Sequence, residues 1–70
     1  MKFAVIYEKT RMGYSAYVPD LPGCVAGGAT FEETAELIRG AIELHLETMR
    51  EDGDLIAEPT TIAGCVAVPV

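Results

Sequence analysis

The sequence has few basic residues, and this shortage excludes one large class of partners. Of its 70 residues, five are lysine or arginine and eleven are aspartate or glutamate, so the formal net charge is −6. Ten of the acids lie between Asp20 and Glu58. A phosphate backbone is bound through clustered lysine and arginine side chains. We therefore expect no direct binding of nucleic acid, and a basic protein as the electrostatic complement.

Long apolar runs are also absent. No segment approaches the ~20 apolar residues that a membrane span needs. The N-terminus, "MKFAVIYEK", lacks the longer apolar region and the small-residue cleavage site of a signal peptide. The two cysteines, Cys24 and Cys65, lie too far apart for metal-ligand spacing. These absences predict a cytoplasmic protein with free thiols, no membrane association, no metal and no cofactor.

Residues that support catalysis are scarce. The single histidine, His45, lies on the apolar side of a predicted helix, which is typical of a packed side chain. Cys24 follows the turn "LPG", and we interpret it as a small buried hydrophobe rather than a nucleophile. We expect no catalytic residues and no enzymatic activity. A small enzyme that uses Cys24 or the acids is the distant alternative.

Seventy residues are enough for a single domain, residues 1–70, with a marginal core. Hydrophobic patterns predict strands over residues 2–9, 14–19 and 24–28. A helix follows, with Thr30 as its N-cap, Glu33 completing a capping box, and Gly53 just beyond its end. A last strand is predicted over residues 61–68. The fold class is therefore α+β, in the order β-β-β-α-β.

The order of these elements predicts their arrangement. The first three strands form an antiparallel meander, and one helix packs on one face of the sheet. A right-handed crossover then places the fourth strand parallel to the first. The first and last strands are apolar on both sides, but one helix covers only one face. Because large exposed apolar patches are rare on monomers, we expect a homo-oligomer, either a dimer or a tetramer.

Two features are candidates for binding a partner. The first is the proline-rich turn, expected beside the helix start: Asp20, Leu21, Pro22 and Gly23. The second is the outer helix face with Glu36, Glu43 and Glu47, which would attract a basic protein. Each has an alternative interpretation. Leu21 can fold back under the helix, and the glutamates can form an ordinary solvated face.

The run "YVPDLPGCVAGGATFEETAELIRGAIELHLETM" resembles the signature of the HicB-like antitoxin family, with its PDLPGC-type turn, its GxT helix start and its "AIELHLE"-like run. The resemblance covers nearly the whole chain. It implies a reduced ribonuclease H-like fold and an antitoxin that binds and blocks a small basic RNA-cleaving toxin of the HicA type.

Many members of that family add a C-terminal DNA-binding domain. This sequence stops at Val70, directly after the last predicted strand, so we expect no DNA-binding role. The ribonuclease H-like fold implies no nuclease activity either, because the strand "FAVIYE" has an acid only at its end. The alternative function is an orphan homo-oligomeric domain without a toxin partner.

Overall fold

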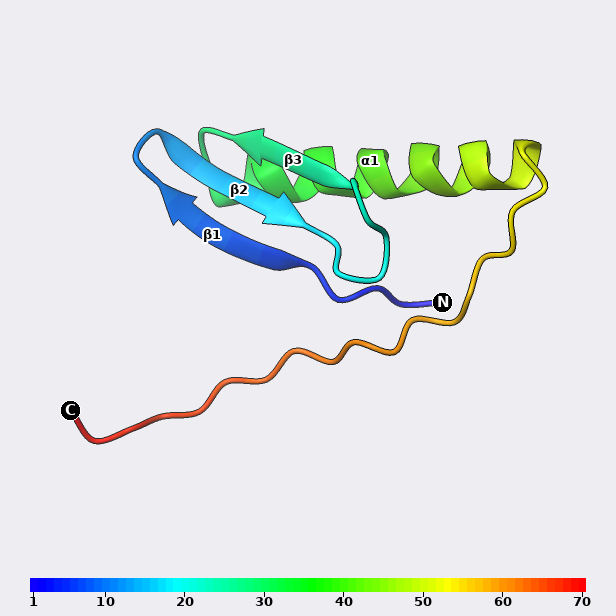
Figure 1. Ribbon diagram of the computed structural model, residues 1–70. Coiled ribbons are helices and arrows are strands. Elements are labelled where there is room, and N and C mark those ends of the chain that lie inside the picture. The colour runs from blue at the N-terminus through cyan, green and yellow to red at the C-terminus, as the bar shows by residue number, and fades with distance from the viewer.

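The fold has two layers, a small antiparallel sheet and one helix that crosses one of its faces (Figure 1). The computed structural model describes all residues, 1–70. Strand β1 spans Ile6–Thr10, β2 spans Gly13–Tyr17, β3 spans Val25–Gly28, and helix α1 spans Phe31–Glu51. The sheet order is β1-β2-β3. This confirms the α+β class, the three-stranded meander and the single helix that the sequence predicts.

The sheet places its second strand tightly against the helix start. Strands β1 and β2 form a hairpin with Thr10 opposite Gly13, and β2 pairs with β3 so that Tyr14 faces Gly28. A Cβ atom on Gly13 would fall on the carbonyl oxygen of Gly28. Glycine is therefore required at position 13, because the two backbones approach too closely for any side chain.

Both ends of α1 are stabilised by local hydrogen bonds, with Thr30 as the predicted N-cap, but the side chain of Glu33 does not complete the predicted capping box. At the start, the backbone N–H of Glu33 donates to the Thr30 hydroxyl oxygen at 3.1 Å. At the end, the N–H of Gly53 donates to Arg50 O at 3.1 Å, and the N–H of Asp54 donates to Met49 O at 2.8 Å. Gly53 adopts a φ of 74°, which is the left-handed conformation of this helix-ending motif.

The core between the layers is small. Four of its five buried apolar residues come from β2 and the connection that follows it, and the fifth comes from α1. They are Ala16, Val18, Leu21, Cys24 and Ile38. Thr34 is also fully buried, and its hydroxyl donates to Thr30 O at 2.8 Å and lies 3.4 Å from Tyr14 O. The polar atom that the core encloses is thus satisfied by backbone on both sides.

The predicted fourth strand is not present. Residues 54–70, called the C-terminal segment below, form neither helix nor strand. The segment leaves the end of α1 and extends away from the body (Figure 1). It raises the radius of gyration to 13.8 Å, where a compact chain of this length would have about 11 Å. Cys65, which the sequence places within a packed strand, is consequently exposed.

Because the fourth strand is absent, the first strand lies at an edge of the sheet rather than at its centre. The sequence predicts a central strand over residues 2–9, whereas β1 begins at Ile6 and pairs only with β2. Its other side is a free edge of the sheet. A strand pattern predicts extended backbone but not a hydrogen-bonding neighbour, and within this single chain nothing lies against that edge.

Candidate functional site

The turn between β2 and β3 is closed by its own backbone. The N–H of Val18 donates to Cys24 O at 3.1 Å, and the N–H of Cys24 donates to Leu21 O at 3.0 Å. A third bond joins the N–H of Leu21 to Val18 O at 3.1 Å. Gly23 has a φ of 85°, a left-handed conformation that favours glycine. We call residues 18–24 the PDLPG turn.

The two sides of the PDLPG turn differ in exposure. Val18, Leu21 and Cys24 are buried in the core, with Leu21 only 4% exposed. Pro22 and Gly23 are exposed, and Asp20 is half-buried. The sequence left open whether the Leu21 side chain meets a partner or folds back under the helix. In the structure the side chain is buried in the core. A partner protein would meet Pro22 and Gly23 on this turn rather than the Leu21 side chain.

Asp20 holds the middle of the C-terminal segment. Its carboxylate accepts hydrogen bonds from the backbone N–H groups of Thr60 and Thr61, at 3.4 and 3.1 Å. The hydroxyls of the same two threonines donate to it at 3.4 and 3.2 Å. Partial removal from water raises the pKa of the Asp20 carboxyl, but the hydrogen bonds from Thr61 and Thr60 together outweigh that effect and lower the pKa below its ordinary value.

We expect this anchor to depend on pH. A lowered folded-state pKa means that the stabilisation is present above the ordinary carboxyl pKa of 3.8 and is lost as pH falls through the lowered value. The amide NMR signals of Thr60 and Thr61 should therefore stay constant from neutral pH down to this range and then shift together. In Asp20→Asn the acid transition should vanish. Threonine signals that titrate identically in Asp20→Asn would contradict the assignment to this carboxylate.

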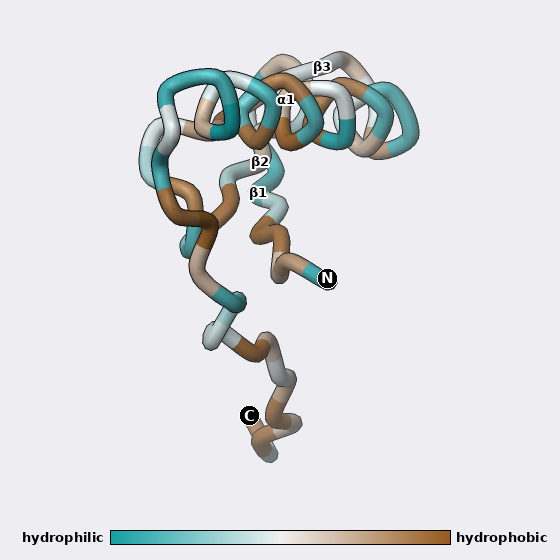
Figure 2. Tube along the Cα trace, turned by 90° about the vertical axis from the view of Figure 1, so that its right-hand side faces the viewer, coloured by the Kyte–Doolittle hydropathy of each residue, from teal (hydrophilic) through white to brown (hydrophobic).

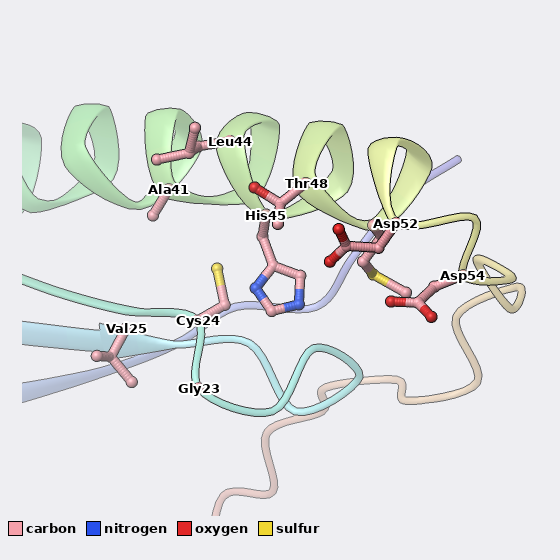
Figure 3. A pocket seen from close by; sticks show the side chains of 10 residues that line it. Gly23, Cys24, Val25, Ala41, Leu44, His45, Thr48, Asp52 and Asp54 are labelled. Atoms are coloured by element: carbon pink, nitrogen blue, oxygen red, sulfur yellow. The ribbon is translucent and has the colours of Figure 1, made fainter.

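A shallow groove of about 430 Å³ lies between the PDLPG turn and the second half of α1 (Figure 3). Gly23, Cys24 and Val25 line it on the strand side. The helix side is formed by residues from Ala41 to Met49, and Asp52 and Asp54 follow at the helix end. In Figure 3 the imidazole of His45 extends from α1 toward the turn, next to Cys24.

The chemistry of this groove does not favour a nucleophile. Cys24 and His45 both line it, as a nucleophile and its base would. However, Cys24 is only 3% exposed, and burial raises the pKa of its thiol. The reactive form of cysteine is the thiolate, which burial disfavours. No group of three or more histidine, cysteine, aspartate or glutamate side chains is placed to hold a metal ion.

The turn lies beside the second half of α1, not beside its start as the sequence suggests. Strand β3 runs from the turn to the N-cap at Thr30, so it separates the two. The chain reverses direction at Thr30, and α1 returns past β3, so that Thr48 and Gly23 line the same groove from opposite sides. The acids that line this groove are Asp52 and Asp54. The sequence analysis did not single out either residue as a candidate.

The three predicted glutamates form a separate surface. Glu36, Glu43 and Glu47 are all exposed. They share the side of the helix opposite Ile38, the α1 residue at the centre of the core. Glu43 forms an exposed ion pair with Arg39 at 3.4 Å, which contributes little to stability. We call these three residues the acidic ridge. Glu43 also lines a second groove, which lies between α1 and the N-terminal residues. None of the three glutamates lines the groove at the turn, so the turn and the ridge do not form one continuous site.

Comparison with known proteins places this arrangement in a family. A family model described as the HicB-like antitoxin of bacterial toxin–antitoxin systems matches residues 3–70. The chain belongs to the HicB-like antitoxin family. A UPF0150 protein of Archaeoglobus fulgidus is 44% identical over 59 residues, which cover 80% of this chain and 86% of that protein. A UPF0150 protein of Helicobacter pylori is 42% identical over 52 residues, or 74% and 72% of the two chains.

A third relative is longer. An uncharacterized 14.9 kDa protein of Haemophilus phage HP1 is 33% identical over 69 residues, which cover 99% of the HicB-like chain but 52% of the phage protein. Membership of an antitoxin family indicates a binding role rather than an enzymatic one, with a toxin of some kind as partner. No helix of the HicB-like chain is long and apolar enough to span a membrane.

Proposed function

We propose that this HicB-like chain neutralises a small basic RNA-cleaving toxin of the HicA type by binding it directly. The observation that carries the proposal is the family match over residues 3–70, almost the whole chain. The charge supports it, because a net charge of −6 complements a basic toxin. Inhibition then needs no chemistry from the antitoxin, only occupation of the surface through which the toxin meets RNA.

Two surfaces are proposed for this contact. The acidic ridge supplies long-range attraction, which raises the association rate more than it raises the affinity. The PDLPG turn supplies a rigid contact through Asp20, Pro22 and Gly23. Its three internal hydrogen bonds and two prolines mean that binding orders little further backbone, so little conformational entropy is lost. Leu21 supports this contact from below by holding the turn in the core.

We further propose that the protein acts in the cytoplasm, where such a toxin would meet its RNA, and as a homo-oligomer, a dimer or a tetramer. The assembled form would contain the four-stranded, ribonuclease H-like sheet that the sequence predicts. The exposed apolar side chains of the C-terminal segment support this part of the proposal, because a soluble chain gains free energy by covering them.

The direct test takes a small basic RNA-cleaving protein of the HicA type as the candidate toxin. Its RNA cleavage is measured while the purified antitoxin is added in increasing amounts. We expect cleavage to fall to background near a stoichiometric amount of the antitoxin, since binding alone blocks the toxin. An active toxin whose cleavage is unchanged by an excess of folded chain would contradict the proposal and favour the orphan alternative.

A further inference from the structure

The C-terminal segment exposes apolar side chains that a folded protein ordinarily covers. Ile62 is 92% exposed and Val66 is 87% exposed. After Thr61, the segment makes no hydrogen bond to the rest of the chain. In Figure 1 it runs in the same direction as β1, and in Figure 2 it hangs away from both the sheet and the helix. It is an extended, strand-like segment without a neighbour.

A second groove, of about 320 Å³, lies beside the free edge of β1. Seven of the nine residues that line it are hydrophobic. They include three alternate residues between the N-terminus and β1 and three of the helix: Phe3, Val5, Tyr7, Ala35, Ile38 and Ile42. The two charged residues that line the groove are Arg39 and Glu43. The groove is therefore the place where the inward side chains of a strand added beside β1 would pack.

The side chains of the C-terminal segment match this groove. In extended backbone, Ile62, Gly64, Val66 and Val68 lie on one side, and Ala63, Cys65 and Ala67 lie on the other. The larger apolar side chains thus share one side of the extended segment. That side could enter the apolar groove. The small residues would lie on the face of the sheet that has no helix.

The chain exposes more area than a compact monomer of its mass. A compact monomer of 7.5 kDa exposes about 4,200 Å², whereas this chain exposes 5518 Å². The excess of roughly 1,300 Å² per chain is larger than the ~800 Å² that each partner buries in a standard stable complex. A surface of this size is enough for a stable dimer.

We propose that a second copy of this chain inserts its residues 62–68 into the groove beside β1, as a fourth strand parallel to β1, and receives the same segment in return. The Asp20 carboxylate is the hinge anchor, since it holds Thr60 and Thr61 at the point where the segment leaves its own chain. Reciprocal exchange closes the dimer, because each copy supplies one strand and fills one edge. It also covers the free edge of β1.

The first test is the mass of the full chain by light scattering at micromolar concentration. We expect the wild type to be a dimer and Val66→Asp to be a monomer, because an aspartate cannot be buried in an apolar groove. Ala67→Ser, on the opposite side of the same strand, should remain a dimer. Circular dichroism should show the same helix signal for all three, with less strand signal for Val66→Asp, because its segment would no longer pair with β1 of another copy. A monomeric wild type, or a dimeric Val66→Asp, would overturn the proposal.

The second test distinguishes exchange from closure within one chain. Ile6→Cys places a thiol on the helix-free side of β1, the side on which Cys65 would lie. Mild oxidation should join position 6 to Cys65 of another copy, so non-reducing electrophoresis should show a species of twice the 7.5 kDa chain mass. Peptide mapping identifies the linked positions. Val25→Cys, at the opposite edge on β3, is the matched control and should not link to Cys65.

Two other outcomes of the cross-linking experiment would overturn the proposal. A bond between position 6 and Cys65 within one chain would mean that the segment closes onto its own sheet. A dimer in which Ile6→Cys never links to Cys65 would mean that the copies meet through another surface. This inference rests on the homo-oligomer of the proposed function and tests it. Because the experiments use the chain alone, their results do not depend on toxin binding, and failure of the antitoxin proposal would leave them unchanged.

Discussion

Replacing Leu21 by alanine is expected to lower the free energy of unfolding by about 2–5 kcal/mol, the range for removing a buried leucine side chain. Leu21 is one of only five buried apolar residues, so few neighbouring side chains can repack into the cavity that the substitution leaves. A 70-residue domain is stable by roughly 4–10 kcal/mol in total. The single substitution therefore removes a large fraction of the stability, which urea denaturation followed by circular dichroism measures.

Val25→Ala is the matched control for this prediction. It also removes apolar atoms next to the turn, but Val25 is 64% exposed, so a change below about 0.5 kcal/mol is expected. Equal free energies of unfolding for the two variants would show that burial of the Leu21 side chain does not stabilise the PDLPG turn. Binding is then compared at a temperature where Leu21→Ala is still folded. An unchanged off-rate there is expected, because the Leu21 side chain lies under the turn and not on its surface.

Reversing two charges of the acidic ridge, with Glu43→Lys and Glu47→Lys together, is expected to slow association with a basic toxin by about tenfold at low salt. Each reversal changes the charge by two, so the formal net charge rises from −6 to −2. The attraction that remains is weaker, and the dependence of the association rate on salt should become flatter. Both side chains are exposed, so the fold should be retained.

The control variant carries Asp52→Lys and Asp54→Lys. It has the same net charge, but its changes lie at the groove beside the PDLPG turn rather than on the ridge. Surface-binding kinetics at two salt concentrations compare the two variants. A larger effect of the ridge variant supports the ridge as the surface that steers the toxin. An equal or larger effect of the control would move the electrostatic contact to the turn and the groove.

The positions of the turn and of the acidic ridge could be predicted from the sequence, because both depend on local interactions. The turn could be located from its prolines and glycines, and the ridge from helical spacing. The direction of the Leu21 side chain could not, because its burial depends on Ile38, which lies seventeen positions further along and is brought near by packing. For the same reason, the sequence alone could not show that the turn and the ridge lie on different sides of the helix.

The helix and its two ends were determined by the sequence itself. Thr30 and Gly53 act through hydrogen bonds that span at most five residues, so their effect needs no tertiary neighbour. The last strand was different. The alternation of residues 61–68 was visible in the sequence, but a strand exists only when another strand accepts its hydrogen bonds. Only the tertiary structure decided that this segment is held at Asp20 and continues away from the edge of β1, because that outcome depends on contacts some forty residues apart.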